Sequence, residues 1–367
     1  MLRSFQYRLN DRNLDQRSSQ TAYLTLLPQL VSIVETSVEV LLRHTAIACL
    51  DRITEKFGKK DAAAVVDTAK IIAGESCLGA AEGSLRIISL QCLATMVEAT
   101  GDAFISVIPK ALPIAISHLE TSIGEDTEDP SLHNAVYSLI GALLLYVPWA
   151  VTGADLDRLL TVSYRSANAI MGEECDRSRA EVLSLVAKQV EAKEYFAVLD
   201  RTWTAAMVEG PPVSTLQITQ YEKRPLTPVQ AVKEYLDILR LAIDRQPKSM
   251  IIKQRETLGD LLLHVFDLRR IQNSPPTEDS YDLSEIDEVE DAVNDCAIAM
   301  VYKLNDATFR PLFLRILEWA TTPTTKGDKG TLHRQTTWFA FLLKFFDMLK
   351  VALGSVLKVS PMLIALP

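Results

Sequence analysis

Apolar residues recur with helical spacing along most of the chain, and the helical segments come in pairs. In the segment 38–57, Ala46, Leu50 and Ile53 are spaced i, i+4 and i+7, which places all three on one face of a helix. No segment alternates apolar and polar residues cleanly, as a strand would, so the pattern predicts an all-α protein. Helix pairs are predicted at 19–34 with 38–57, 61–73 with 84–100, 103–121 with 131–147 and 154–171 with 175–190, and further helices at 227–245, 249–271, 293–301, 305–320 and 332–349.

Two prolines show how the pairs repeat. Pro28 and Pro109 each lie in an apolar run of the first helix of a pair, where we expect them to kink the helix, and they are 81 positions apart. This separation equals two periods of about 40 residues, which is typical of HEAT and armadillo repeats. A single pair cannot bury its own apolar face and must stack on its neighbours. The sequence therefore predicts a HEAT/armadillo-like α-solenoid of stacked antiparallel helix pairs.

The repeating pattern is interrupted once by a segment rich in glycine and proline. This segment, 209–226, predicts a linker, and Thr227 followed by Pro228 then predicts the capped start of a new helix. The predicted organisation is HEAT-like repeats at 1–208, the linker at 209–226, a C-terminal HEAT-like region at 227–350 with an acidic loop at 273–291, and an apolar tail at 351–367 that we expect to be truncated.

Composition fits a packed helical chain and limits its partners. Hydrophobic residues make up 48% of the sequence, and the net charge is −9, which argues against a surface that tracks phosphates throughout. Any RNA contact must therefore be a local basic patch. The segment from Ser131 to Ala154 carries no fixed charge and is long enough to span a bilayer. Because Pro148 ends its helix early, we favour a buried inner helix over a membrane span.

Residues with catalytic or metal-binding potential form no recognisable site. The five cysteines include no CxxC pair and are typical of small buried hydrophobes in a reducing compartment. A glycine spacing suited to phosphate binding, Gly74 to Gly79, is followed by Ala80 and Ala81 where lysine and serine or threonine are required. The histidines are scattered. We therefore predict no enzymatic activity, no cofactor, no metal and no small-molecule substrate.

Basic residues cluster near several predicted helix ends, most densely between 223 and 270. Bases are favoured at helix C-termini by the helix dipole alone, so each cluster has a structural explanation as well as a functional one. Arg310, in the segment Phe309 to Phe313, is either solvated or pairs with RNA phosphate or with an acid of 285–291, while Phe309, Leu312 and Phe313 are expected in the core. The candidate contacts for RNA or an acidic partner are Lys223, Arg224, Arg240, Arg245, Lys248, Lys253, Arg255, Arg269, Arg270 and Arg310.

Eight acids between 278 and 291, without an intervening base, form the most acidic stretch of the chain. They favour a solvated loop that runs into a charged first helical turn, since carboxylates complement the positive end of the helix dipole. The alternative is a docking strip for a basic peptide.

The segments 218–229, 305–313 and 318–320 carry a resemblance to a known family. They resemble the C-terminal region of a very large eukaryotic HEAT-repeat protein of UtpA, a subcomplex of the nucleolar small-subunit processome. This resemblance implies a nucleolar, non-enzymatic scaffold in early pre-ribosomal RNA processing, linked to RNA polymerase I transcription. The implied partners are other processome proteins and pre-ribosomal or small nucleolar RNA, with no membrane. The tail after Lys350 departs from the further helices that the family leads us to expect.

Two other classes of protein remain open on the residues alone. An adaptor of the transport-receptor or phosphatase-regulatory type would show a continuous acidic concave face for a soluble cargo. An enzyme with an unrecognised site would show a deep polar pocket with converging titratable groups.

Overall fold

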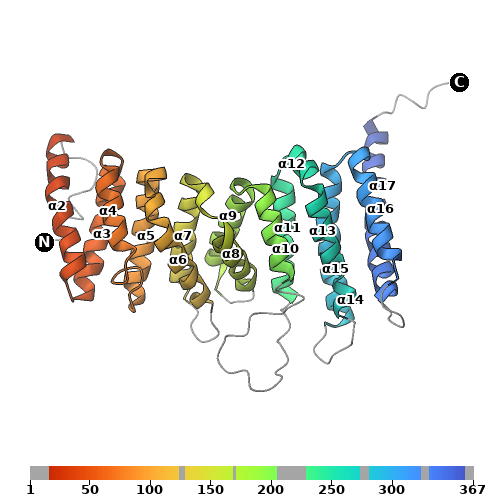
Figure 1. Ribbon diagram of the computed structural model, residues 1–367, viewed down its shortest axis with the longest axis horizontal. Coiled ribbons are helices and arrows are strands. Elements are labelled where there is room, and N and C mark those ends of the chain that lie inside the picture. Colours follow the sequence, from red (N-terminus) through yellow and green to blue (C-terminus); the bar gives the residue numbers. More distant parts are fainter. Residues whose placement is uncertain are drawn as a thin grey trace, which may run out of the picture. The chain divides into compact units, whose positions relative to one another are not determined.

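The computed structural model describes residues 16–123, 129–167, 171–204, 229–272, 281–323 and 330–359, with side chains described from Leu24 to Lys350 within these ranges. All regular elements in the described ranges are helices, and they stack as pairs (Figure 1). The predicted all-α solenoid is confirmed. By backbone contacts the chain divides into two compact units, unit 1 from Met1 to Val190 and unit 2 from Glu191 to Pro367.

Unit 1 is a stack of four helix pairs. The second helices of the pairs, α3, α5, α7 and α9, pack against one another in succession. Ala46, Leu50 and Ile53 are buried in α3, as the helical spacing predicted. The helices are α2 (Gln16–Thr36), α3 (Val40–Phe57), α4 (Ala62–Ile72), α5 (Gly83–Thr100), α6 (Ile108–Ser122), α7 (Pro130–Tyr146), α8 (Gly153–Ser166) and α9 (Glu173–Gln189), with 3-10 turns at Gly58–Lys60, Gly101–Ser106 and Pro148–Ala150.

The uncharged helix α7 is an inner helix of this stack. Most of its apolar side chains are buried between α5 and α9, including Leu139, Ile140 and Leu143. In the described part of the chain no single helix is long and apolar enough to cross a membrane, although one bent pair, Gly83–Ser106 with Ile108–Ser122, passes by length and composition.

The two prolines of the repeat have different positions. Pro28 lies inside α2, but Pro109 lies in the first turn of α6, and Pro113 is the proline inside that helix. The expected kink at Pro109 is therefore wrong. The first turn of a helix accepts proline because its amide would have no intrahelical partner there, and the residues before it form a separate 3-10 turn instead.

Unit 2 differs from the predicted segments in two places. The predicted helix 249–271 is divided into three by turns at Gln254 and Asp267. The described part of the acidic segment is helical from Leu283, and Asp282 and Glu285 form its capping box. The predicted linker and the predicted cap at Thr227 lie outside the described residues. The helices are α10 (Ala192–Trp203), α11 (Val229–Arg245), α12 (Lys248–Lys253), α13 (Arg255–Phe266), α14 (Leu268–Gln272), α15 (Leu283–Lys303), α16 (Asp306–Thr321) and α17 (Gly330–Val359).

An aromatic cluster joins α16 to α17. Phe309 packs on Phe345 with ring centroids 5.4 Å apart, and Phe313 packs edge-on against Trp338 at 5.1 Å. Leu312 is buried, whereas Phe309 and Phe313 are only half-buried. The predicted core role of this segment thus holds fully for Leu312 and in part for the two phenylalanines.

The five cysteines are buried and form no disulfide. Their burial agrees with the role of small core residues that the sequence predicted.

Candidate nucleic-acid interface

Four exposed bases lie at one end of the helices of unit 2, and we call them the basic end: Arg245, Lys248, Lys253 and Arg310. Arg245 is the last residue of α11, and Lys248 and Lys253 open and close α12. None of the four makes an ion pair with a described residue. They are therefore charged side chains that remain available to a partner.

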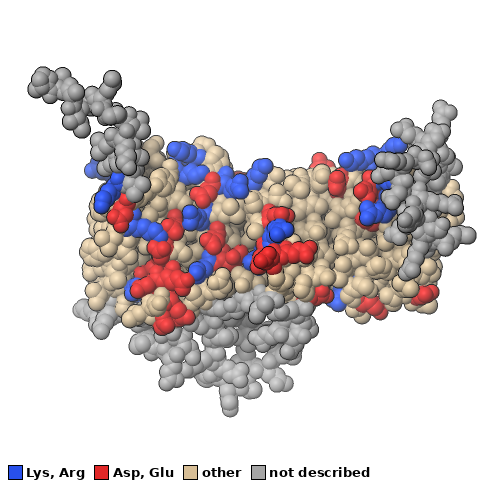
Figure 2. All heavy atoms as spheres, turned by 180° about the vertical axis from the view of Figure 1, so that it is seen from behind, with Lys and Arg blue, Asp and Glu red and all other residues tan. Residues whose placement is uncertain are grey.

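Contacts between turns hold this end of unit 2 together. The Nζ atom of Lys303, at the end of α15, donates to the backbone carbonyls of Asp244 and Gln246 at 2.8 and 3.1 Å. The start of α13 meets the start of α16, where Arg255, Thr308 and Pro311 line a small hollow of about 40 Å³. The turns that carry the four bases are thus packed on one another. Figure 2 shows Lys and Arg side chains along the upper edge of its left half, above a concentration of Asp and Glu.

The helix dipole accounts for only two of the four bases. Arg245 and Lys253 end their helices, where a positive charge is favoured by the partial negative charge of the last carbonyls. Lys248 begins a helix, and Arg310 lies near the start of α16. Positive charge is disfavoured at the first position of a helix, and the dipole has little effect beyond the first turn, so neither Lys248 nor Arg310 has such a structural explanation.

Two further candidates at this end are partly neutralised. Arg240 lies 3.9 Å from a carboxylate oxygen of Asp244 and 3.7 Å from one of Asp295. Arg255 lies 3.3 Å from Glu256 and donates to the backbone carbonyl of Ile252. These pairs are substantially exposed to solvent, so they contribute little stability and can be exchanged for a phosphate.

Arg269 and Arg270 leave the set of candidate contacts because their side chains are bound inside unit 2. The guanidinium of Arg269 donates to both carboxylate oxygens of Glu290, at 2.8 and 2.6 Å, and also to Asp287. Arg269 is 8% exposed and Glu290 is 4% exposed. The hydrogen bonds to Glu290 raise the pKa of Arg269 despite its burial, and Thr337 of α17 donates to the same carboxylate at 2.5 Å.

A second buried carboxylate, Asp267, lies next to this network. It accepts hydrogen bonds from Arg270 and, at 2.8 Å, from Nε of Arg334, whose guanidinium stacks over the Trp319 ring at 5.2 Å. Burial alone would raise the pKa of Asp267, but the bonds and charges of Arg270 and Arg334 together outweigh it and lower the pKa. These arginines fix α14 and α17 together and do not face a ligand.

The acids of 285–291 are largely occupied by other bases. Glu288 pairs with Lys233 at 2.5 Å and Asp291 pairs with Lys344 at 2.6 Å, while Asp287 pairs with Arg269. The alternative in which Arg310 pairs with this segment is therefore wrong, and few of its charges are left for a docked basic peptide. Lys223 and Arg224 lie outside the described residues.

The fold and this surface together define a class of protein. It is an α-solenoid of the HEAT/armadillo kind, and its unit 2 has a basic end and buried ion pairs. Residues 250–355 match the model of the BP28CT (NUC211) domain. This range begins within α12 and ends within α17, so it covers most of unit 2 that follows α11.

Long fungal proteins resemble nearly the whole chain. It is 41% identical over 351 residues to "U3 small nucleolar RNA-associated protein 10" of Coccidioides immitis (strain RS), and 38% identical over 351 residues to the protein of the same name from Neurospora crassa. Each alignment covers 95% of this chain and 18% of the relative. The chain therefore corresponds to less than a fifth of the length of these relatives.

Solved structures with similar backbones are helical-repeat proteins of distant sequence. The Kap95p structure with RanGDP is 12% identical, with a TM-score of 0.43 over 98% of this chain and 41% of that chain. A designed armadillo repeat protein is 13% identical, with a TM-score of 0.40 over 75% of this chain and 99% of that chain.

Proposed function

We propose that this chain is a non-enzymatic scaffold segment in ribosome biogenesis, acting in the nucleolar small-subunit processome in early pre-ribosomal RNA processing. The observation that carries the proposal is the similarity of 95% of the chain to relatives named for association with U3 small nucleolar RNA. The described residues support a scaffold role, since a helical repeat protein works by stacking its repeats and displaying an extended surface. Its partners are then processome proteins and small nucleolar or pre-ribosomal RNA, and the subcomplex is UtpA, with its link to RNA polymerase I transcription.

The basic end is the RNA contact in this proposal. Four exposed bases on adjoining turns can neutralise phosphates on one stretch of backbone, and two of them, Lys248 and Arg310, occupy positions that the helix dipole does not explain. Such contacts position RNA without reading its sequence. The net charge of −9 restricts the contact to this patch.

The transport-receptor alternative requires a continuous acidic concave face. The second helices of unit 1 do not supply one, because α7 has no charged residue along its entire length from Pro130 to Tyr146. The proposal of a processome scaffold is therefore preferred.

A charge-reversal variant tests the RNA contact. We expect Lys248→Glu, Lys253→Glu and Arg310→Glu together to weaken binding of the full chain to a structured RNA in gel-shift titrations, and to reduce the salt slope by about three. The matched control is Lys59→Glu, Lys110→Glu and Lys193→Glu, which changes the net charge equally at exposed lysines elsewhere. Equal loss in both variants would mean that the contact is nonspecific attraction to net charge.

Crosslinking and co-purification of the tagged chain test the cellular role. We expect U3 small nucleolar RNA and processome proteins to be recovered with it. Recovery of soluble transport cargo without these components would favour the alternative adaptor class.

A further inference from the structure

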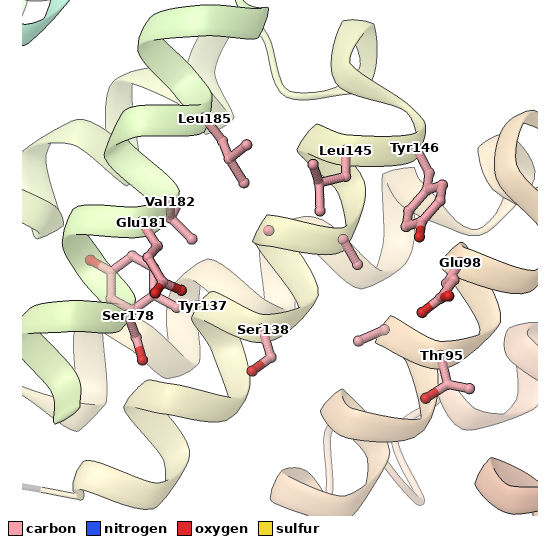
Figure 3. A pocket seen from close by; sticks show the side chains of 13 residues that line it. Thr95, Glu98, Tyr137, Ser138, Leu145, Tyr146, Ser178, Glu181, Val182 and Leu185 are labelled. Atoms are coloured by element: carbon pink, nitrogen blue, oxygen red, sulfur yellow. The ribbon is translucent and has the colours of Figure 1, made fainter. Parts of the chain in front are cut away.

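Unit 1 carries a hollow that the proposed RNA contact does not use. It has a volume of about 400 Å³ and lies across α5, α7 and α9, the consecutive second helices of three repeats (Figure 3). Its size is at the lower end of the range for ligand sites. Small residues create it: Ala94 of α5 and Gly141 and Ala142 of α7 leave room that longer side chains would fill.

Two carboxylates lie on opposite sides of the hollow. Glu98 projects from α5 and Glu181 from α9, and both are exposed (Figure 3). Tyr146 lines the same side of the hollow as Glu98 (Figure 3). No lysine, arginine or histidine is among the residues that line the hollow. Neither glutamate forms an ion pair with a base in the described ranges.

The rest of the lining is hydroxyl and aliphatic. Thr95, Ser138 and Ser178 supply hydroxyl groups, while Leu145 and Leu185 form an apolar rim, and Leu145 is 55% exposed. A side chain with a long aliphatic stem and a positive end fits both parts, since its stem can lie along a leucine of the rim while its charge pairs with one of the carboxylates. Phosphate is disfavoured at the same place because two glutamates would repel it.

We propose that this hollow docks an extended basic segment of a partner protein, with one lysine or arginine side chain paired with Glu98 and a second paired with Glu181. Charge complementarity selects this occupant over RNA, and the leucines of the rim select a segment in which apolar residues flank the two basic ones. The proposal is independent of the RNA contact, because it concerns other residues in a different unit.

A designed peptide tests the docking. The probe is a fluorescein-labelled peptide of sequence Gly-Ser-Leu-Arg-Leu-Lys-Leu-Ser-Gly, and its binding to the full chain is followed by fluorescence anisotropy at low and high salt. We expect binding that weakens with salt. Glu98→Gln with Glu181→Gln should weaken it about tenfold, the effect of losing two partly exposed charge pairs.

Two further variants separate the hollow from general electrostatics. Gly141→Leu fills the floor without changing charge, and should abolish binding of the peptide. Glu173→Gln with Glu174→Gln removes two exposed carboxylates from the first turn of α9, outside the hollow, and should leave the affinity unchanged. Circular dichroism and thermal melting establish that each variant is folded, and the isosteric glutamine pair keeps the test valid if the leucine variant is not.

Several results would overturn the proposal. One is unchanged peptide affinity in the folded Glu98→Gln, Glu181→Gln variant; another is equal binding of a peptide with glutamate at both basic positions. Displacement of the peptide by oligouridylate would identify RNA as the occupant. A self-association of the chain that these two substitutions remove would identify a second copy. Each result is distinct from loss of RNA binding at the basic end.

Discussion

The two units differ in how their buried arginines are paired. In unit 2 both partners of an ion pair are buried, since Arg269 and Glu290 lie within the interior contacts of α14 and α15. In unit 1 the buried base, Arg179, pairs with Asp176, which is 58% exposed at its side chain. The inner helix α7 has no charged residue and buries a neutral histidine instead. The inner helix α7 of unit 1 is thus packed with neutral groups, whereas α14 and α15 of unit 2 are joined by a buried ion pair.

This difference has consequences for where a ligand can bind. A buried ion pair is stable only when its geometry and remaining hydrogen bonds are satisfied, so Arg269, Glu290 and Thr337 restrict how α14, α15 and α17 can be arranged. The neutral helix α7 carries no such constraint, and the hollow lies where it has a glycine in place of a longer side chain, at Gly141. Unit 2, which has the buried ion pair, therefore presents bases at its basic end that are unpaired in the described part of the chain. Unit 1 presents a hollow on its second helices.

The largest expected effect is at the buried ion pair. Arg269→Ala should lower the free energy of unfolding of unit 2 by about 3–5 kcal/mol, because Glu290 would be left buried without its partner. Urea unfolding followed by tryptophan fluorescence measures this, since Trp319 and Trp338 both lie in unit 2. The matched control is Arg52→Ala in unit 1, which removes an exposed pair with Glu55 and should cost less than about 1 kcal/mol. Equal losses in the two variants would remove the contrast between the units.

The next effect is a loss of stability of unit 1 in mild acid. His133 of α7 is fully buried, neither ring nitrogen has a hydrogen-bond partner among the described atoms, and its ring packs edge-on against Tyr137 at 4.8 Å. Burial lowers the pKa of His133 to about 4, with the charge of Arg179 lowering it further and that of Asp176 opposing it. The unfolded chain binds a proton near pH 6.5, whereas the folded chain does not until about pH 4. Stability should therefore fall by about 3 kcal/mol as the pH falls through this window.

The histidine effect can be separated from the carboxylates of unit 2. His133→Phe should reduce the pH dependence between about 6.5 and about 4, as measured by urea unfolding at a series of pH values, and the remainder belongs to His118, whose pKa burial also lowers. The depressed pKa of Asp267 acts in a lower window: its contribution is complete above the unfolded pKa of about 3.9 and is lost as the pH falls towards the folded value. An unchanged slope in the His133→Phe variant would show that His133 does not contribute to it.

The sequence predicts those features that depend on local periodicity. The buried face of α3, the inner position of α7 and the burial of the cysteines follow from apolar spacing alone. The position of Pro109 does not, because an apolar run on both sides of a proline is compatible with a kink or with a helix start. The capping box at Asp282 is local, but the acid-rich composition around it also fits a loop.

The candidate site is less predictable because pairing is a tertiary property. Arg269 and Arg270 adjoin each other in the sequence, yet one binds Glu290 of α15 and the other binds Asp267 of its own turn. No spacing rule distinguishes them from Lys248, which forms no ion pair with a described residue. The hollow of unit 1 escapes prediction for the same reason, since it needs three helices to bring two glutamates to opposite sides of one glycine.

The smallest effect compares two glycines inside helices, one in each unit. A Cβ atom at Gly141 of α7 would meet only Val182, at 3.7 Å, which is ordinary contact. At Gly259 of α13 it would lie 3.2 Å from Leu312 and 3.4 Å from Arg315, so those neighbours would have to move. Alanine is favoured over glycine within a helix by about 0.5–1 kcal/mol. Gly141→Ala should therefore raise the free energy of unfolding by about that amount, and Gly259→Ala should gain less or lose stability.

The same pair of glycines also bears on the hollow. The alanine methyl at Gly141 occupies little of the 400 Å³, so Gly141→Ala should stabilise unit 1 while leaving the affinity for the basic peptide nearly unchanged, in contrast to Gly141→Leu. Urea unfolding and peptide anisotropy on one protein preparation measure both quantities. If the only role of Gly141 is to leave the hollow open, the alanine variant should gain stability without losing affinity for the peptide. If alanine at 141 lowers stability instead, α7 is packed more tightly against α9 than the contact with Val182 indicates. Unit 1 is then packed as closely around Gly141 as unit 2 is around Gly259.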